Sequence, residues 1–160
     1  MPEANEELTR SRIIRLAFGG DQATFDEFIK MLREVRLDDC EVILRGSAVT
    51  GYRWADGQPF DADGPGTSDL DVTFLSPAML ECWELFYIPG MLSVPLSDEH
   101  PDACPSLLGL RSRLSQLARR PVNLQASRSL VQFARDVLFD QPYYTLIEKS
   151  DEEHRETPAA

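Results

Sequence analysis

Within the segment SDLDVTFL, residues 68–75, polar and apolar side chains alternate from Asp69 to Phe74. In an extended chain, side chains two positions apart point to the same side, so the apolar set and the polar set face in opposite directions. The apolar set is Leu70, Val72 and Phe74, and the polar set is Asp69, Asp71 and Thr73. This alternation predicts a β-strand that packs one face against a hydrophobic core and turns two carboxylates to the other face.

Helical periodicity and short apolar runs organise the rest of the chain. The predicted helices are 6–18, 21–37, 76–86, 106–120 and 127–139, and the other predicted strands are 40–46 and 121–127. Asp21 is a candidate N-cap for the second helix, and Ser76 and Pro77 form a typical helix start. We therefore expect an α/β (α+β) fold, in which a short mixed β-sheet carries helices packed mainly on one face.

Length and composition favour a single domain. The chain has 160 residues, of which 42% are hydrophobic, enough for an ordinary core. We expect one domain over residues 1–150 and a disordered polar tail over 151–160. No apolar run is long enough to span a membrane, the N-terminal segment does not resemble a signal peptide, and Cys40, Cys82 and Cys104 form no disulfide or zinc pattern. The sequence thus predicts a cytoplasmic protein without a membrane segment.

The charge of the chain is strongly negative, at −11, but it is unevenly distributed. An acidic protein repels polyphosphate, so generic nucleic-acid binding is not expected. Residues 103–135 nevertheless hold six arginines and no carboxylate: Arg111, Arg113, Arg119, Arg120, Arg128 and Arg135. These arginines fit solvated helix faces paired with acids elsewhere, and they also fit a local site for a phosphorylated small molecule.

Asp69 and Asp71 are the first candidates for chemistry. Residues two apart in a strand have Cα atoms about 6.6 Å apart and point the same way. Two such carboxylates repel each other and are stabilised by a cation between them. Their hard oxygen ligands suit Mg²⁺ or Mn²⁺, which complete their shells with water and substrate phosphate. Taken alone, the pair also fits a solvated polar strand face.

A second pattern lies upstream, where a predicted strand runs into Gly46 and Ser47 and then a short helix that ends at Gly51. Glycine lets the backbone approach a ligand closely, and serine adds a hydroxyl donor. Backbone N–H groups at such a helix start favour an anion. Phosphate held by Gly46 and Ser47, with its metal held by the two aspartates, would make a triphosphate-binding site.

Together these motifs resemble the nucleotidyltransferase superfamily with the DNA polymerase β-type catalytic core, in particular its minimal single-domain members. Gly46 and Ser47 match the family's Gly-Ser, and Asp69 and Asp71 match its metal-binding pair. The similarity covers about residues 41–125. It implies metal-dependent transfer of a nucleoside monophosphate from a nucleoside triphosphate, with ATP the expected nucleotide, to an acceptor hydroxyl that the sequence does not identify. Pyrophosphate would be released, and Mg²⁺ or Mn²⁺ would be the cofactor.

Three positions depart from the family pattern. The interval between Ser47 and Asp69 holds 21 residues, because of a predicted loop over residues 52–67. Ala48 stands where a basic residue is common, so Arg45 or Arg53 would have to contact phosphate. Asn123 stands on the third strand where the family carries its third carboxylate, and an amide has no charge and cannot act as a general base.

Asn123 keeps a second hypothesis open: a catalytically reduced nucleotide-binding or partner-binding module, antitoxin-like or regulatory, that retains the fold. The two hypotheses differ in whether another acid reaches the aspartate pair. The candidates are Asp61, Asp63, Asp98 and Asp102. Among the aromatic residues, Trp54 and Phe60 could stack on a base, whereas Trp83, in a predicted helix, is expected in the core.

Overall fold

The computed structural model describes residues 2–37 and 39–149, beginning with two long helices. α1 (Pro2–Ala17) is followed by α2 (Gln22–Val35). The Asp21 carboxylate accepts hydrogen bonds from two backbone N–H groups in the first turn of α2, which satisfies donors that have no partner within the helix. Both helices and the predicted N-cap are therefore confirmed.

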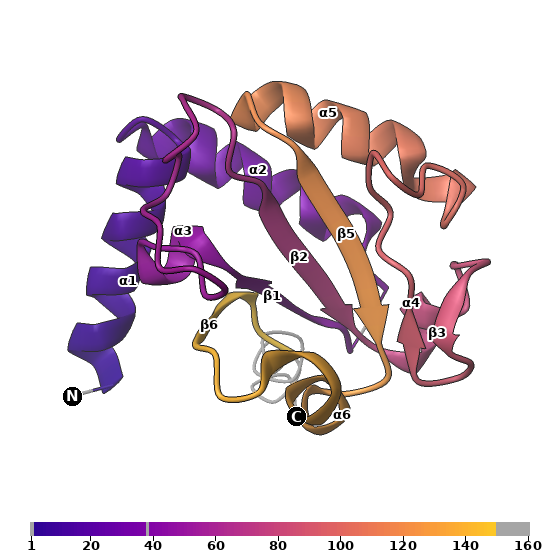
Figure 1. Ribbon diagram of the computed structural model, residues 1–160. Coiled ribbons are helices and arrows are strands. Elements are labelled where there is room, and N and C mark those ends of the chain that lie inside the picture. The colour runs from indigo at the N-terminus through magenta and orange to yellow at the C-terminus, as the bar shows by residue number, and fades with distance from the viewer. Residues whose placement is uncertain (1, 38, 150–160) are drawn as a thin grey trace, which may run out of the picture.

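The strands form one mixed sheet, which in the described residues has six strands in the order β3-β4-β5-β2-β1-β6 (Figure 1). They are β1 (Glu41–Arg45), β2 (Leu70–Leu75), β3 (Phe86–Ile88), β4 (Leu92–Ser93), β5 (Val122–Ser127) and β6 (Tyr143–Ile147). β2 lies in the middle, antiparallel to β1 and parallel to β5. The predicted mixed sheet is confirmed.

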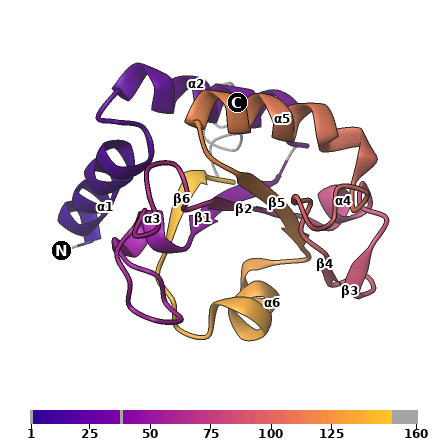
Figure 2. The same ribbon diagram turned by 45° about the horizontal axis from the view of Figure 1, so that its top comes forward.

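The helices lie mainly on one face of this sheet, as the sequence predicted. Figure 2 shows α2 and α5 above the sheet and α6 below it. The remaining helical elements are α3 (Ser47–Thr50), α4 (Pro77–Leu80), a 3-10 turn (Pro105–Leu107), α5 (Leu108–Ala118), α6 (Leu130–Phe133) and a π-helical turn (Ala134–Leu138). The fold is a single α+β domain.

Two hydrophobic clusters confirm the alternation in β2. Leu70, Val72 and Phe74 belong to the larger cluster, which the residues of α1, α2 and α5 complete. Leu75 belongs to a smaller cluster on the opposite face, with Phe133 of α6. The sheet therefore has a fully covered face and a partly covered face, and the aspartates of β2 point to the partly covered one.

Some elements differ from the predicted ones. The helix that begins at Ser76 ends at Leu80 instead of continuing to residue 86, and a β3–β4 hairpin follows it. Gly90 turns this hairpin with a φ of +76°, a conformation that glycine adopts without steric cost. β6 was also not predicted; it pairs with β1 at the edge of the sheet.

The predicted loop over residues 52–67 is confirmed, and it is anchored to the end of α5. Arg120, whose side chain is 7% exposed, forms an ion pair with Asp61 at 2.8 Å. Its guanidinium also donates a hydrogen bond to the Ser68 carbonyl at 2.9 Å and lies 4.6 Å from the centre of the Phe60 ring. This half of the loop is therefore held against the body of the domain.

Within the described ranges, none of the helices combines the length and the apolar character needed to cross a bilayer. The predicted polar tail, 151–160, lies outside the described residues.

Candidate functional site

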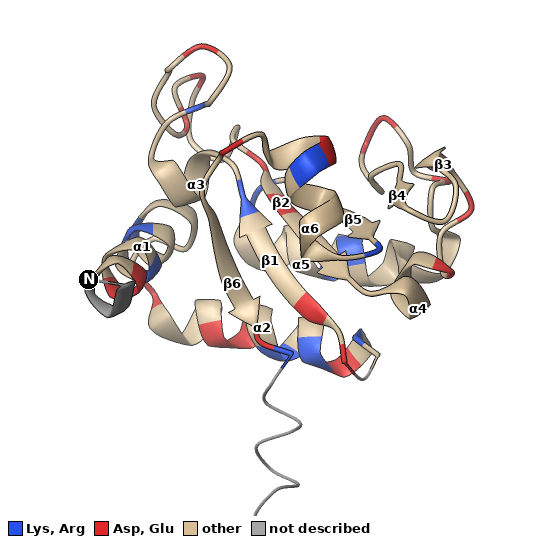
Figure 3. Ribbon diagram, turned by 90° about the horizontal axis from the view of Figure 1, so that it is seen from below, with Lys and Arg blue, Asp and Glu red and all other residues tan. Residues whose placement is uncertain are grey.

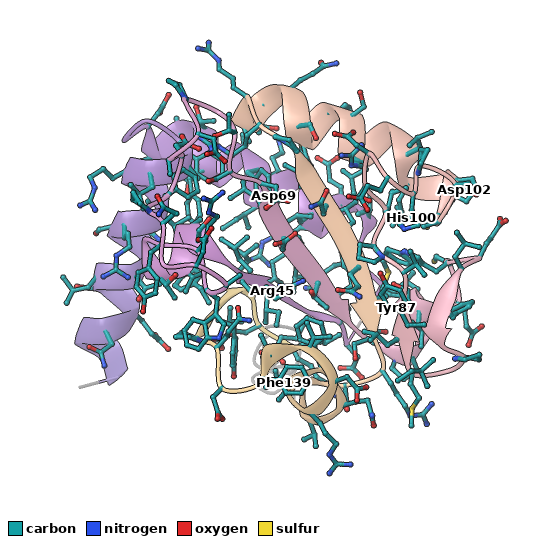
Figure 4. The ribbon with its side chains drawn as sticks, in the orientation of Figure 1. Arg45, Asp69, Tyr87, His100, Asp102 and Phe139 are labelled. Carbon is teal, nitrogen blue, oxygen red and sulfur yellow. The ribbon has the colours of Figure 1, made fainter. Side chains whose placement is uncertain are left out.

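Three strand ends bring the predicted residues together on the partly covered face of the sheet. Arg45, at the end of β1, is the register partner of Asp71 in β2, and Asp71 is the partner of Asn123 in β5. Asp69 comes directly before β2. Figure 4 labels Asp69 and Arg45 in this central part of the molecule. The pairing explains the clustering, because register partners in neighbouring strands point to the same side of a sheet.

Asn123 bridges the two carboxylates. Its Nδ2 donates hydrogen bonds to Asp69 Oδ2 at 2.8 Å and to Asp71 Oδ1 at 3.0 Å. A side-chain amide carries two N–H donors on this nitrogen, one for each acceptor, whereas its oxygen would repel both carboxylates. The amide therefore holds the aspartate pair together with hydrogen bonds but without a compensating charge.

The carboxylates still interact unfavourably. The pKa of Asp69 lies above its ordinary value, chiefly because its surroundings limit hydration and secondly because the Asp71 carboxylate lies close to it. The hydrogen bond from Asn123 and the charge of Arg45 act in the opposite direction and do not cancel the rise. A cation would relieve the same unfavourable field.

Gly46 places the backbone directly beside Asp71. It has a φ of +101°, and a Cβ atom at this position would lie 3.4 Å from Asp71 Oδ2. The following Ser47 is 9% exposed and begins α3, which ends at Gly51 in the left-handed conformation. The predicted sequence of strand, Gly-Ser, short helix and glycine is thus present, and it adjoins the aspartate pair.

Arg45 projects into the same region, and its guanidinium makes few polar contacts. Its Nη1 lies 4.0 Å from Asp71 Oδ2, and its Nε is buried without a hydrogen-bond partner. The guanidinium lies 5.9 Å from the centre of the Phe133 ring, which supports it from α6. Arg45 consequently retains donor capacity for an anion.

Arg53, the other predicted phosphate-contacting residue, is engaged differently. Its guanidinium pairs with Asp63 at 3.0 Å and with Asp56 at 3.2 Å, both within the loop. Arg53 lines the same cleft as the aspartate pair. To contact a phosphate it would have to share or exchange these partners.

None of the four candidate third acids completes the aspartate pair. Asp102 is exposed and does not line the cleft. Asp61 pairs with Arg120, and Asp98 pairs with Arg111 at 2.9 Å. Asp63 lines the cleft but pairs with Arg53. Across residues 2–37 and 39–149, no group of three or more His, Cys, Asp or Glu side chains is placed to hold a metal ion. Asn123 therefore has no carboxylate substitute in this arrangement.

A cleft of about 480 Å³ contains the aspartate pair, the Gly46–Ser47 turn and Arg45. It is lined by Arg45, Gly46, Ser47, Arg53, Trp54, Ala55, Asp63, Thr67, Ser68, Asp69, Asp71 and Gln141. Gln141 was not predicted, since it lies far away in the sequence, after the π-helical turn, and no motif surrounds it. A larger cavity of about 660 Å³, beside Asp61 and Arg120, contains neither aspartate of the pair.

None of the six arginines of residues 103–135 lines this cleft. Arg111 and Arg120 form the ion pairs described above. The other four, Arg113, Arg119, Arg128 and Arg135, are exposed on several different elements. The structure thus favours the solvated-face interpretation for this basic segment.

The donor set fits one divalent cation. Asp69 and Asp71 offer two carboxylates on one side of the strand, and the Asn123 amide would present its oxygen after a half-turn of the side chain. Carboxylate and amide oxygens are the ligands that Mg²⁺ and Mn²⁺ accept. A second cation would lack the third carboxylate.

Comparison with known proteins adds no relative: no protein-family model, no curated protein and no solved structure matches the chain.

Proposed function

We propose that this protein is a metal-dependent nucleotidyltransferase, which moves a nucleoside monophosphate from a nucleoside triphosphate to an acceptor hydroxyl and releases pyrophosphate. One observation carries the proposal: Asp69 and Asp71 converge beside the Gly46–Ser47 turn at a single cleft. Phosphate binding and metal binding must occur side by side in such a reaction. The proposed cofactor is Mg²⁺ or Mn²⁺, and ATP is the proposed nucleotide.

Each residue has a distinct part in this proposal. Gly46 lets the backbone approach the phosphates, and Ser47 donates a hydroxyl hydrogen bond. Arg45 lines the cleft and would offer its guanidinium to a phosphate oxygen. Asp69 and Asp71 ligate the divalent ion, which when bound would neutralise charge on the triphosphate and its leaving pyrophosphate.

We expect the transfer reaction to be slow. Asn123 cannot take a proton from the attacking hydroxyl, and positioned general bases typically contribute about 10²- to 10⁴-fold in rate. Asp63 is the loop acid that lines the cleft in the described residues, but it is paired with Arg53. The acceptor must therefore be reactive or must bring its own base.

A second function has its own supporting observation. Because the Asn123 amide already bridges Asp69 and Asp71, the pair is held together without a metal. This favours a catalytically reduced module that binds a nucleotide or a protein partner without transfer. We place either activity in the cytoplasm, where nucleoside triphosphates are available and where free thiols such as those of Cys40, Cys82 and Cys104 persist.

The test is incubation of the protein with each nucleoside triphosphate, labelled at the α-phosphate, in Mg²⁺ or Mn²⁺, while labelled product and pyrophosphate are measured. Candidate acceptors are supplied as RNA ends, protein hydroxyls and small molecules. The Asp69→Asn/Asp71→Asn double variant is the control and should lose both transfer and metal-dependent binding. Its melting temperature in metal-free buffer should not fall, because the substitution removes two repelling charges.

The outcomes separate the two functions. Transfer that depends on the aspartates supports the enzyme. Aspartate-dependent nucleotide binding without transfer to any acceptor supports the reduced module. Nucleotide and metal affinity that is unchanged in the double variant, measured by calorimetry, would reject the enzyme and a reduced module that binds nucleotide at this site.

A further inference from the structure

Trp54 lies in the cleft with an exposed aromatic face. Its exposed fraction is 48%, and it lines the cleft together with Gly46, Ser47 and the aspartate pair. Among the described residues that line this cleft, Trp54 is the only aromatic one. Trp83 is different, since it is 3% exposed and packs 6.3 Å from Phe74 in the core. Core packing therefore accounts for Trp83 but not for Trp54.

Contacts of the neighbouring Arg53 fix the backbone turn that carries Trp54. The Arg53 side chain pairs with Asp63 at 3.0 Å and with Asp56 at 3.2 Å. The backbone N–H of Arg53 donates to the Gln58 carbonyl at 2.6 Å, and the Gly57 N–H donates to the Arg53 carbonyl at 2.8 Å. Since this turn is already closed, binding at the indole would order little additional chain.

The cleft has the dimensions of a mononucleotide site. Its volume of about 480 Å³ falls within the range of about 300–1,000 Å³ typical of small-ligand pockets. The Gly46–Ser47 turn and the aspartate pair are among its polar groups, whereas its aromatic surface belongs to Trp54. A ligand with a polyanionic end and a flat aromatic end matches both parts.

We propose that Trp54 stacks on the nucleobase of the bound nucleoside triphosphate, which makes it the specificity-determining residue for the donor nucleotide. This inference rests on the proposed function, because it assumes that the phosphates lie at Gly46 and Ser47. Stacking depends on ring area more than on hydrogen-bond pattern, so purine nucleotides bind more tightly than pyrimidine nucleotides. Gln141, in the same cleft, adds an amide donor and acceptor for the base edge.

Calorimetry with two probes separates the base from the phosphates. The probes are ATP and inorganic tripolyphosphate, each with Mn²⁺. Trp54→Ala should weaken ATP binding by about 5- to 150-fold and leave tripolyphosphate binding unchanged, because tripolyphosphate has no base to stack. Trp54→Phe retains an aromatic ring and should restore most of the ATP affinity. Asp69→Asn/Asp71→Asn should weaken binding of both probes.

Intrinsic fluorescence gives an independent measurement, since Trp54 and Trp83 are the two tryptophans of the chain. ATP with Mn²⁺ should quench the exposed Trp54 and leave the buried Trp83 unaffected. The Trp54→Phe variant, in which Trp83 alone emits, should show no quenching. Its unchanged melting temperature would show that the fold is intact.

Each remaining outcome decides one of the claims. If wild-type protein binds ATP through the aspartates and Trp54→Ala binds it equally well, the stacking inference is wrong and the proposed function stands. If Trp54→Ala weakens the binding of ATP and of tripolyphosphate equally, Trp54 supports the loop and does not recognise the base. If wild-type protein binds neither probe, the inference fails together with the proposed function.

Discussion

Asn123 donates a hydrogen bond to each carboxylate of the aspartate pair, and this changes what the pair needs from solution. Without such a donor, two neighbouring carboxylates require a cation or a shared proton. With it, the pair is held in the metal-free protein, although the pKa of Asp69 stays above its ordinary value, first because its hydration is limited and secondly because of the Asp71 carboxylate. A metal would compete with the amide for the same carboxylate oxygens.

Replacement of Asn123 by aspartate tests this competition. We expect Asn123→Asp to lower the melting temperature in metal-free buffer, because three carboxylates then repel one another, and to raise Mn²⁺ affinity. If the protein is the proposed enzyme, the transfer rate should also rise, by up to the roughly 10²- to 10⁴-fold that a general base supplies. Thermal unfolding with and without Mn²⁺, together with the labelled-nucleotide assay, measures these effects.

The control for this experiment is Asn123→Ala, which removes the donor without adding charge. It should also destabilise the metal-free protein, by about 1–2 kcal/mol for lost hydrogen bonds to charged groups. Its Mn²⁺ affinity should stay below that of Asn123→Asp. A native enzyme that is already fast and becomes slower in Asn123→Asp would show that the base lies elsewhere, for example on the loop that carries Asp63.

Gly46 and Ser47 should differ in how much change they tolerate. Gly46→Val should abolish nucleotide binding, because φ is +101° and the new side chain would crowd Asp71 Oδ2, which lies 3.4 Å from the Cβ position. Ser47→Ala should weaken binding by about 1 kcal/mol, or somewhat more if its partner is a charged phosphate. Calorimetry with ATP and Mn²⁺ measures both.

Gly90→Ala is the matched control for backbone strain. Gly90 also has a positive φ, of +76°, but nothing lies within 4 Å of its Cβ position and it is outside the cleft. The Gly90→Ala variant should be less stable than the wild type but should bind nucleotide equally tightly. Negligible effects of both Gly46→Val and Ser47→Ala on affinity would mean that this turn is purely structural.

At the scale of elements, periodicity predicted what local sequence encodes. The alternation in 68–75 gave β2 and the direction of its aspartates, and helical spacing gave α1, α2 and α5. β6 and the β3–β4 hairpin were missed because short strands at or near a sheet edge carry little alternation of their own and depend on long-range partners. Gln141 and Phe133 were also not predicted, because they come to lie beside the site only through long-range packing of the fold.

The loop over 52–67 acts as an element of its own, held by Arg120 and Asp61. Burial alone would raise the pKa of Asp61, but hydrogen bonds from Arg120 and from the backbone N–H groups of Ser68 and Gly66 outweigh it, and the pKa lies below its ordinary value. A lowered pKa means that the ionised form stabilises the fold. This stability is complete above the unfolded-state pKa, about 3.9, and is lost as pH falls through the lower folded-state value.

Asp61→Asn should therefore destabilise the protein at pH 7 by about 2 kcal/mol, since it leaves the mostly buried Arg120 without its charged partner. The difference from wild type should begin to shrink below about pH 4, where Asp61 becomes protonated in the unfolded chain, and should shrink further as pH falls through the lower folded-state pKa. Urea unfolding across this pH range measures it. Asp63→Asn, which breaks an exposed pair in the same loop, is the control and should cost much less stability, because solvent screens that pair. Equal losses in both variants at every pH would contradict this account.

At the scale of the whole molecule, the net charge of −11 dominates the surface. Figure 3 shows acidic segments on the loop after α3 and around β3 and β4. The excess of like charge disfavours the compact state, and salt screens it over a Debye length of about 10 Å at 0.1 M. Charge therefore bears on stability here more than on the choice of fold.

We expect the melting temperature to rise when NaCl is increased from about 0.01 M to about 0.2 M, because screening relieves this self-repulsion. Differential scanning calorimetry measures the shift, and the same salt series on Asp61→Asn serves as the comparison. A fall in melting temperature with salt would show that specific surface ion pairs, such as that between Arg53 and Asp63, outweigh the net repulsion.

The amide bridge at Asn123 also has a consequence for the history of such a gene. Asparagine and aspartate codons differ only in their first base, so one transition mutation converts the bridging amide into a third carboxylate or reverses the change. With asparagine, both aspartates keep a hydrogen-bond donor and the domain needs no metal at this position. If the protein is the proposed enzyme, this single base change would therefore exchange metal-free stability for metal affinity and transfer rate.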